Sequence, residues 1–422
     1  MNTSFARHTA VIGRGIIGLS TALRLREQGL LIVIIGRQRL PGSASWAATG
    51  VSAMRGLLQP KTEIFRQKLL GHHLLARLIP ELENLTKQTI PHDFSGAYEF
   101  FPRETYGKLR RRVYHRLPTG LFAFKCLNFE QTKTHLGPFS QAWDEGDKKA
   151  AFFYPKDGWF DPESLMAALE LRLEQLGVVF IAEAADKISP ENSDDSLLIS
   201  TETSIFRVAR VVVAAGAGSE NILKNSDIFR NEISYSSGIT MRTKFRESSS
   251  SLAIKSGADS WLCTNGELRC GGENIAAAKD YSPGDLALAE EKLKNKFSRL
   301  SAEVFGTKFT NENQYLFTAS EIRAGVRVRM TGDKPWVGFS PFRSKPGAGV
   351  WINCGYYKYG FYAAFPGAEK LAALIQSSSH PVGAKREALL HKLSRFKEAR
   401  SEQRSDRLAV STRSDKADAE DG

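Results

Sequence analysis

A turn containing three glycines near the N-terminus constrains this chain most. In TAVIGRGIIGLSTALRLREQGLLIVII, Gly13, Gly15 and Gly18 follow an apolar run and open a helical pattern over 16–28, and a second apolar run covers 30–35. A strand, a glycine-rich turn, a helix and a parallel strand form the unit that binds dinucleotides. Gly13 permits the tight turn, Gly15 lets a pyrophosphate approach, and Gly18 lets the helix pack closely on the sheet. The sequence therefore predicts a nucleotide-binding βαβ unit.

Gly36 and Arg37 depart from the usual end of such a unit. An Asp or Glu normally stands there and accepts hydrogen bonds from the ribose hydroxyls, whereas glycine offers no acceptor. Arg37 is also a residue type that recognises a 2′-phosphate, so the local sequence leaves NADP open as the nucleotide. Arg14 lies between the first two glycines, and its side chain can extend toward solvent or toward the adenosine.

Composition and length exclude several classes of protein. The chain has 422 residues, a net charge of +12 and 42% hydrophobic residues, which suggests two domains with a sizeable core. The four cysteines form no CxxC pair and the eight histidines form no metal-binding motif, so no metal site is expected. No apolar run is long enough to cross a membrane, and the N-terminus lacks a secretory signal, so a cytoplasmic location is expected. The basic run at 108–116 is interpreted as a solvated helix face.

Strand and helix patterns are distributed discontinuously along the chain. Nucleotide-type elements are predicted at 9–50, 178–219 and 350–376, with β-rich segments between them. Helices are predicted over 161–177, with Asp161 as N-cap, over 284–304, and over 61–88, with an interruption near Pro80. This order indicates an α/β domain with a second sheet domain inserted.

Five motifs in order resemble the D-amino-acid oxidase superfamily of FAD-dependent oxidoreductases, especially its glycine-oxidase-like members. They are the glycine turn, PGSASWAATG at 41–50, RVARVVVAAGAGS at 207–219, AGVRVRMTGDKPWVGFSP at 324–341, and WINCGYYKYGFYAAFPGAEKLAALI at 351–375. The resemblance covers about residues 8–378. It implies a discontinuous Rossmann-like FAD-binding domain with an inserted mixed β-sheet substrate domain.

The expected domain boundaries follow from this resemblance. The FAD-binding domain comprises 1–90, 151–225 and 325–380, and the substrate-binding domain comprises 91–150 and 226–324. The charged tail at 384–422 lacks apolar periodicity and is expected to be disordered.

The resemblance also implies which residues contact the cofactor. The glycine turn holds the FAD diphosphate, the loop at 41–50 follows the diphosphate, ribityl chain and flavin, and backbone N–H groups of 355–360 or Lys358 stabilise negative charge on the reduced ring. That loop contains no His or Cys, so FAD is expected to bind non-covalently. The predicted cofactor-binding residues are Gly13, Gly15, Ile16, Ile17, Gly18, Gly36, Arg37, Ser43, Ser45, Trp46, Ala47, Gly50, Ala185, Ala215, Gly216, Gly355, Tyr357, Lys358, Tyr359 and Gly360.

Arg327, in AGVRV, matches the arginine that binds the substrate carboxylate in the family. An arginine suits this role because its planar fork binds a carboxylate bidentately and keeps its charge when desolvated. Arg323 and Arg329 are neighbouring competitors for the role. Tyr235 and Tyr357 are candidates to supply a hydroxyl at the active site.

The reaction implied by the resemblance is oxidation of the C–N bond of a small amino acid or secondary amine. The α C–H passes a hydride to flavin N5, water hydrolyses the imine, and O2 or another acceptor reoxidises the flavin. AGVR and its flanking residues also resemble a domain that trims a carboxymethylamino group on tRNA wobble uridine, which is less favoured because no aromatic-basic RNA platform is evident. Gly36 and Val328 depart from the family pattern and keep open a flavin-binding protein without amine oxidase activity.

Overall fold

The computed structural model describes most of the chain. The described residues are 2–38, 42–52, 63–101, 124–136, 150–191, 196–228, 232–244, 251–256, 259–264, 266–276, 280, 282–305, 321–330, 334–345 and 348–378. The chain forms two compact units, residues 1–371 and 372–422, and of the second only the end of helix α9 (Gly360–Ser378) is described. The basic run at 108–116 and the tail at 384–422 lie outside the described residues.

A largely parallel sheet of eight strands gathers segments that are far apart in the sequence. Its main order is β10-β2-β1-β13-β12-β11, and β20 pairs with β13 and β19. The strands β10, β2, β1, β13 and β20 run parallel to one another. Strand β12 pairs antiparallel with β13 and with β11, and β19 pairs antiparallel with β20. The three separated segments predicted from the sequence therefore meet in one sheet. The strands are β1 (Asn2–Ile12), β2 (Ile32–Ile35), β10 (Val179–Ile181), β11 (Ala185–Pro190), β12 (Leu197–Thr201), β13 (Ile205–Val213), β19 (Trp336–Pro341) and β20 (Gly349–Cys354).

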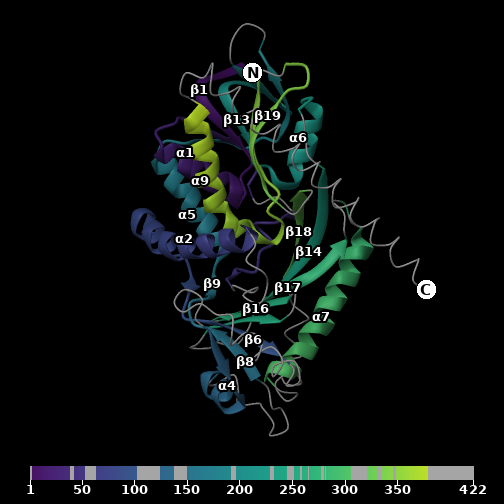
Figure 1. Cartoon of the computed structure of the whole chain (residues 1–422). Coiled ribbons are helices and arrows are strands. Elements are labelled where there is room, and N and C mark those ends of the chain that lie inside the picture. The colour runs from purple at the N-terminus through teal and green to yellow at the C-terminus, as the bar shows by residue number, and fades with distance from the viewer. Residues whose placement is uncertain are drawn as a thin grey trace, which may run out of the picture. The chain divides into compact units, whose positions relative to one another are not determined.

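Helices cover both faces of this sheet. Figure 1 shows α1 (Ile16–Glu27) and α5 (Pro162–Gln175) on one side of β1 and β13, and α6 (Ser219–Asn225) on the other. Asp161 caps α5 as predicted, because its side chain accepts a hydrogen bond of 2.8 Å from Ser164 N. The short 3₁₀ turns η2 (Gly216–Gly218) and η5 (Tyr357–Tyr359) follow β13 and β20.

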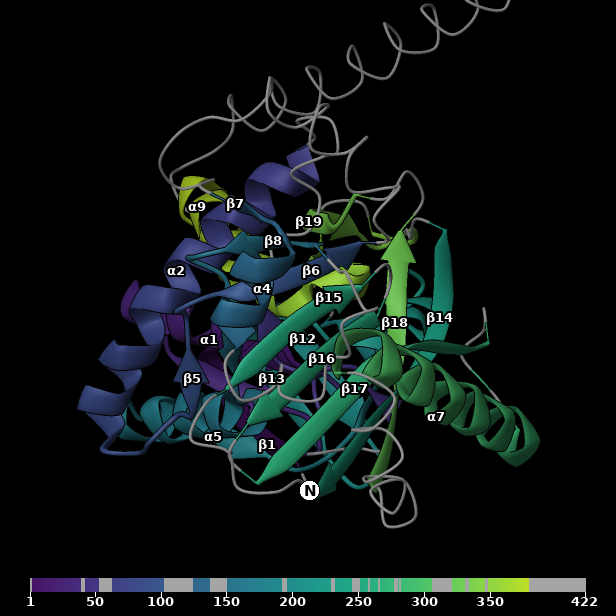
Figure 2. The ribbon, with the colours of Figure 1, turned by 90° about the horizontal axis from the view of Figure 1, so that it is seen from below.

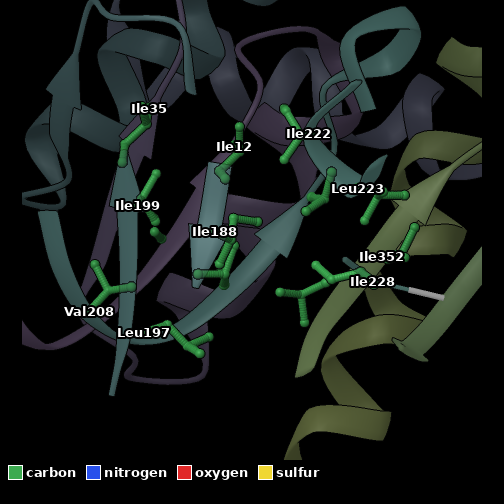
Figure 3. Close-up of a cluster of buried hydrophobic side chains, with 14 of the residues drawn as sticks. Ile12, Ile35, Ile188, Leu197, Ile199, Val208, Ile222, Leu223, Ile228 and Ile352 are labelled. Carbon is green, nitrogen blue, oxygen red and sulfur yellow. The ribbon is translucent and has the colours of Figure 1, made fainter. Parts of the chain in front are cut away.

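The core beneath α6 is formed by aliphatic side chains from strands of both directions. Figure 3 shows Ile12, Ile188 and Ile222 converging in it, from β1, β11 and α6 respectively. Ile188 is fully buried, and Ile12 and Ile222 are 2% and 4% exposed. This apolar core holds the ends of β1 and β13 in place, and the glycine turn starts from the end of β1.

A second, mixed sheet of nine strands has the order β3-β18-β14-β17-β16-β15-β6-β8-β7. Figure 2 shows β15, β16 and β17 side by side, with the long helix α7 (Pro283–Phe305) against β17. Aromatic and aliphatic residues such as Tyr98, Met241 and Trp261 form its core. The strands are β3 (Gly42–Ser43), β6 (Ala97–Phe101), β7 (Lys125–Leu127), β8 (Ala150–Tyr154), β14 (Ile233–Lys244), β15 (Leu252–Ser256), β16 (Asp259–Thr264), β17 (Glu267–Ala276) and β18 (Glu321–Met330).

Smaller elements complete the described structure. A three-stranded sheet joins β4 (Val51–Ser52), β9 (Gly158–Phe160) and β5 (His92–Asp93), and α4 (Phe129–Leu136) contacts β7 and β8. The residue predicted as a domain boundary, 325, lies inside β18, and all of β18 belongs to the nine-stranded sheet.

Helix α2 (Glu63–Thr86) corrects one expectation. Pro80 does not interrupt it, although a proline removes one backbone donor from the helix. The neighbouring Ile79 and Leu82 are 0% and 1% exposed, so apolar packing on both sides of the proline holds the helix together.

Candidate active site

A cavity of about 1540 Å³ lies at the carboxyl ends of the parallel strands and extends to the nine-stranded sheet. This volume exceeds the roughly 300–1,000 Å³ of pockets for drug-sized ligands, so it has room for a dinucleotide and a small substrate. Gly18, Trp46 and Tyr235 are the predicted site residues that do not line it. The predicted residues that do line it are Gly13, Gly15, Ile16, Ile17, Gly36, Arg37, Ser43, Ser45, Ala47, Gly50, Ala185, Ala215, Gly216, Arg327, Gly355, Tyr357, Lys358, Tyr359 and Gly360.

The glycine turn has the geometry that a diphosphate site requires. Gly13 has φ +122°, and a Cβ on it would lie 2.4 Å from Ala214 O. A Cβ on Gly18 would lie 1.9 Å from Gly13 O, so Gly18 lies beneath the turn and not at the cavity surface. Helix α1 begins at Ile16 without an acidic residue in its first turn, which leaves its N-terminus suited to an anion.

The loop at 42–50 is fixed to the start of helix α1 and to the nine-stranded sheet. Ser45 Oγ accepts a hydrogen bond of 3.1 Å from Ile16 N, and Ala47 O accepts one of 2.5 Å from the Thr240 hydroxyl. Trp46 points away from the cavity, because its ring packs against Arg323 with 4.6 Å between the guanidinium carbon and the ring centroid. The loop therefore contributes small side chains and backbone to the cavity wall, in agreement with a cofactor lying along it.

Arg327 projects from β18 into the cavity. Its Nη1 donates a hydrogen bond of 3.1 Å to Asn274 Oδ1, and a Cβ on Gly238 would lie 2.3 Å from the same nitrogen. Burial lowers the pKa of the Arg327 guanidinium, and the nearby Tyr357 phenol raises it. In the described residues no carboxylate lies within ion-pair distance of Arg327. A half-buried cation without a counter-charge favours an anionic ligand.

The two competing arginines have other contacts. Arg323 pairs with Glu163 and with Glu321, at 2.7 Å from its Oε1, so its charge is already balanced. Arg329 packs its guanidinium carbon 4.2 Å from the centroid of the Tyr357 ring and does not line the cavity. Of the three, the cavity contains only Arg327.

Tyr357 lies among cationic groups beside Arg327. It has the left-handed φ of +51°, and Lys358 Nζ lies 5.4 Å from its ring centroid. Burial raises the pKa of the Tyr357 phenol. A hydrogen bond with Ser236 and the charges of Lys358, Arg329 and Arg327 lower the pKa by more than burial raises it, so the net shift is downward. The phenol is thus close to the candidate carboxylate site and is easier to ionise than an ordinary tyrosine.

Tyr235 is not brought to the cavity. Its hydroxyl donates to Glu220 Oε2 at 2.5 Å, and its ring packs on the core beneath α6. Tyr235 pairs with Val328 across β14 and β18, whereas Ser236 pairs with Arg327. Because successive residues of a strand face opposite sides, the register that points Arg327 into the cavity points Tyr235 away from it.

Some residues that line the cavity lie outside the sequence motifs. The buried carboxylate of Glu99 lines the cavity, is 4% exposed, and accepts a hydrogen bond of 2.7 Å from the Tyr154 hydroxyl. Thr240 and Ser260 line the same region. The only signal for them is strand alternation, since Tyr98 on the same strand as Glu99 packs in the opposite core.

The described part of the chain offers neither a metal site nor a membrane-spanning helix. It holds no group of three His, Cys, Asp or Glu side chains that could bind a metal ion. None of its helices is long and apolar enough to span a membrane. The glycine turn, the small-residue loop and the open helix terminus fit the adenine dinucleotide FAD that the motifs imply.

Comparisons with known proteins identify the family of this chain. A family model for FAD dependent oxidoreductase (DAO) matches residues 8–374, and a search of curated proteins found no match. The fold is similar to iminodiacetate oxidase from Chelativorans sp. BNC1, with TM-score 0.70, 18% identity, and coverage of 90% of this chain and 98% of that chain. It is similar to glycine oxidase from Geobacillus kaustophilus, with TM-score 0.68, 16% identity, and coverage of 87% and 94%. It is also similar to L-proline dehydrogenase from P. horikoshii, with TM-score 0.69, 17% identity, and coverage of 91% and 96%. The family model spans most of the sequence, and the chain therefore belongs to the DAO family of FAD-dependent oxidoreductases.

Proposed function

We propose that this protein oxidises the C–N bond of a small amino acid or secondary amine that carries a carboxylate. FAD, the cofactor of the family, supplies the two-electron acceptor when it is bound. The substrate becomes an imine, which water hydrolyses, and O2 or another acceptor removes the electrons. The observation that carries the proposal is the Arg327 guanidinium, which is half-buried in the cavity without a carboxylate partner among the described residues.

Arg327 binds and orients the substrate in this proposal. Its planar fork holds the carboxylate, which fixes the α-carbon next to the flavin ring. Asn274 holds one nitrogen of the guanidinium, and Gly238 leaves the space that the guanidinium occupies. The substrate carboxylate then supplies the missing counter-charge.

The similar structures support a substrate of this class. The names of three of these proteins specify iminodiacetate, glycine and L-proline, and each of these compounds has a carboxylate next to a C–N bond. We further propose that the eight-stranded sheet belongs to the FAD-binding domain and that the nine-stranded sheet provides the substrate side of the cavity. FAD is held non-covalently by the cavity-lining residues of the glycine turn, the loop at 42–50 and the segment 355–360.

The test is an anaerobic reduction screen of the purified holoprotein. Glycine, sarcosine, D-amino acids, proline analogues and modified tRNA are mixed with the protein, and loss of the oxidised flavin absorbance is followed. We expect reduction by at least one small carboxylated amine. Reduction by modified tRNA alone supports instead the trimming of wobble uridine. A yellow protein that none of these compounds reduces contradicts amine oxidation.

Replacing Arg327 separates substrate binding from cofactor binding. Arg327→Ala should raise KM for the reducing amine about 100-fold, because two charge-assisted hydrogen bonds are lost, while FAD content stays unchanged. Arg343→Ala is a matched control, since Arg343 is 56% exposed and lies 4.0 Å from Asp227, away from the cavity lining. An unchanged KM in Arg327→Ala would remove this residue from the substrate site.

A further inference from the structure

Position 36 leaves the adenosine end of the cavity without the usual carboxylate, and Arg14 occupies the adjacent space. A Cβ on Gly36 would lie 3.1 Å from Arg14 N and 3.4 Å from Arg14 Cβ. Both residues line the cavity. The side chain that replaces the acid at this point of the wall is therefore an arginine from the glycine turn itself.

The Arg14 side chain is held rigidly. Its Nε donates a hydrogen bond of 2.6 Å to Glu170 Oε1 on α5, and its guanidinium carbon lies 4.5 Å from the ring centroid of Phe180. The side chains of Arg14 and Glu170 are 11% and 10% exposed. Glu170 Oε2 in turn accepts a hydrogen bond of 2.7 Å from Gln38 Nε2. A stacked, ion-paired guanidinium loses little conformational entropy when it binds a ligand.

The contacts of Arg14 use Nε and one face of the guanidinium. Within the part of the chain that the structure describes, neither Nη atom donates to another side chain or carbonyl. The Nη donors of this nearly buried side chain are available at the cavity wall to a ligand that carries acceptor oxygens. Ribose hydroxyl oxygens are acceptors as well as donors, so they can satisfy it.

We propose that Arg14 binds the adenosine ribose in place of the missing acid, by donating hydrogen bonds from its Nη atoms to the 2′- and 3′-hydroxyl oxygens. The direction of hydrogen bonding is then reversed relative to the usual site, in which a carboxylate accepts from those hydroxyls. Glu170 is a positioning residue that keeps the guanidinium in place. The inference rests on the FAD cofactor of the family and not on the amine substrate proposed above.

Nucleotide binding to apoprotein tests this without any substrate. The dissociation constants of ADP, 2′-deoxy-ADP and 3′-deoxy-ADP are measured by calorimetry for the wild type and for Arg14→Gln. In the wild type we expect loss of a hydroxyl to weaken binding about 10-fold, the effect of one charge-assisted hydrogen bond. In Arg14→Gln we expect ADP and its deoxy analogues to bind equally. The ratio of interest is the dissociation constant of a deoxy analogue divided by that of ADP. The same ratio in the wild type and in Arg14→Gln would overturn the proposal.

Three further variants sharpen the experiment. Arg172→Gln, on the same helix as Glu170 but outside the cavity lining, should keep the wild-type ratio. Glu170→Gln should reduce the ratio only in part, because the guanidinium stays but is held less firmly.

Glu202→Gln tests the carboxylate that pairs with Arg37 at the same end of the cavity. Loss of the ratio in Glu202→Gln, together with its retention in Arg14→Gln, would assign the ribose to Glu202 and overturn the proposal. Should Arg14→Gln fail to fold, Arg14→Lys replaces it, and we expect a ratio between one and the wild-type value.

Discussion

Gly238 lies directly against the Arg327 guanidinium, so a single methyl group tests how that arginine is placed. A Cβ at this position would be 2.3 Å from Nη1 and 2.5 Å from Nη2. The end of a long side chain can move aside, so we expect Gly238→Ala to fold with a change in stability below about 1 kcal/mol. We expect KM for the carboxylated amine to rise about 10-fold or more, because a displaced guanidinium no longer meets the carboxylate.

Steady-state kinetics and urea unfolding of the same variant check this prediction. Gly338→Ala is the control, since a Cβ there meets no atom within 4 Å. This change should alter neither KM nor the free energy of unfolding. A Gly238→Ala protein with wild-type KM would show that the position of the guanidinium does not limit binding.

The phenol of Tyr357 should titrate below the usual range for tyrosine. Burial opposes its ionisation, but the Ser236 hydrogen bond and the cations Lys358, Arg329 and Arg327 favour the phenolate and prevail, so its pKa is lowered. As pH rises, this tyrosine should therefore lose its proton before an ordinary tyrosine, whose pKa is about 10. A spectrophotometric pH titration should show an early phenolate step that is absent in Tyr357→Phe. Identical titrations of the two proteins would contradict the prediction.

Single residues differ in how far the sequence predicts them. Arg327 was found because it belongs to a motif, and its neighbour in the cavity, Tyr357, lies in a second motif. The placement of Tyr235 depends on the pairing register of β14 with β18, which a sequence read alone does not provide. Glu99 was missed for the same reason, since its strand alternates between a core side and a cavity side.

At the scale of elements, the start of α5 connects the helices beside the eight-stranded sheet to the nine-stranded sheet. Asp161 caps the helix and also lies 2.5 Å from Arg269 Nη2 on β17, a strand of the nine-stranded sheet. Replacing it with Ala removes the cap and one carboxylate of a buried ion pair, and Glu267 remains at 2.6 Å from the same Arg269 nitrogen. We expect Asp161→Ala to lose about 3 kcal/mol of unfolding free energy, measured by guanidinium denaturation at neutral pH.

The pH dependence of stability provides the check on this element. Burial raises the pKa of Asp161. Arg269 and the Ser164 backbone lower the pKa by more than burial raises it, so the pKa in the folded state lies below that in the unfolded state. The stabilisation is therefore present above the unfolded pKa near 3.9 and is lost as pH falls below it. The difference in stability between wild type and Asp161→Asn should shrink on acidification. A difference that stays constant down to pH 3 would show that the ionised carboxylate is not what stabilises the fold.

Element predictions succeeded where local chemistry determines the element. The helices α1, α5 and α7 have apolar periodicity, and α5 also has its predicted cap, so their bounds were found closely. The two-residue strands β3, β4 and β5 were not found, because such short strands are defined by their partners and not by their own residues.

At the scale of the whole molecule, the cavity wall is shared by both large sheets. The glycine turn after β1 and the residues Gly271 and Arg327 of β17 and β18 line the same cavity. FAD at 100 times its dissociation constant should stabilise the folded state by about 2.7 kcal/mol. Hydrogen exchange should therefore slow in β17 as well as in β1 when apoprotein binds FAD. Slowing confined to the eight-stranded sheet would show that the sheets do not share the cofactor.

The fold class was predictable, whereas the strand order was not. The motifs identified the parallel unit and the existence of an inserted sheet. The order of the nine strands arises from pairings between residues far apart, such as Ile254 of β15 with Tyr98 of β6, and no local pattern encodes such a pairing.

The pairing of β20 with β13 has a consequence for synthesis of the protein. The parallel sheet is complete only when residues 349–354 have joined strands that begin at residue 2. A ribosome that adds about 5–20 residues per second needs roughly 20–70 seconds to travel that far. During this interval Val212 and Val213 of β13 lack their partner strand and are open to wrong partners, so newly made chains should depend on chaperones until residues 349–354 have been made.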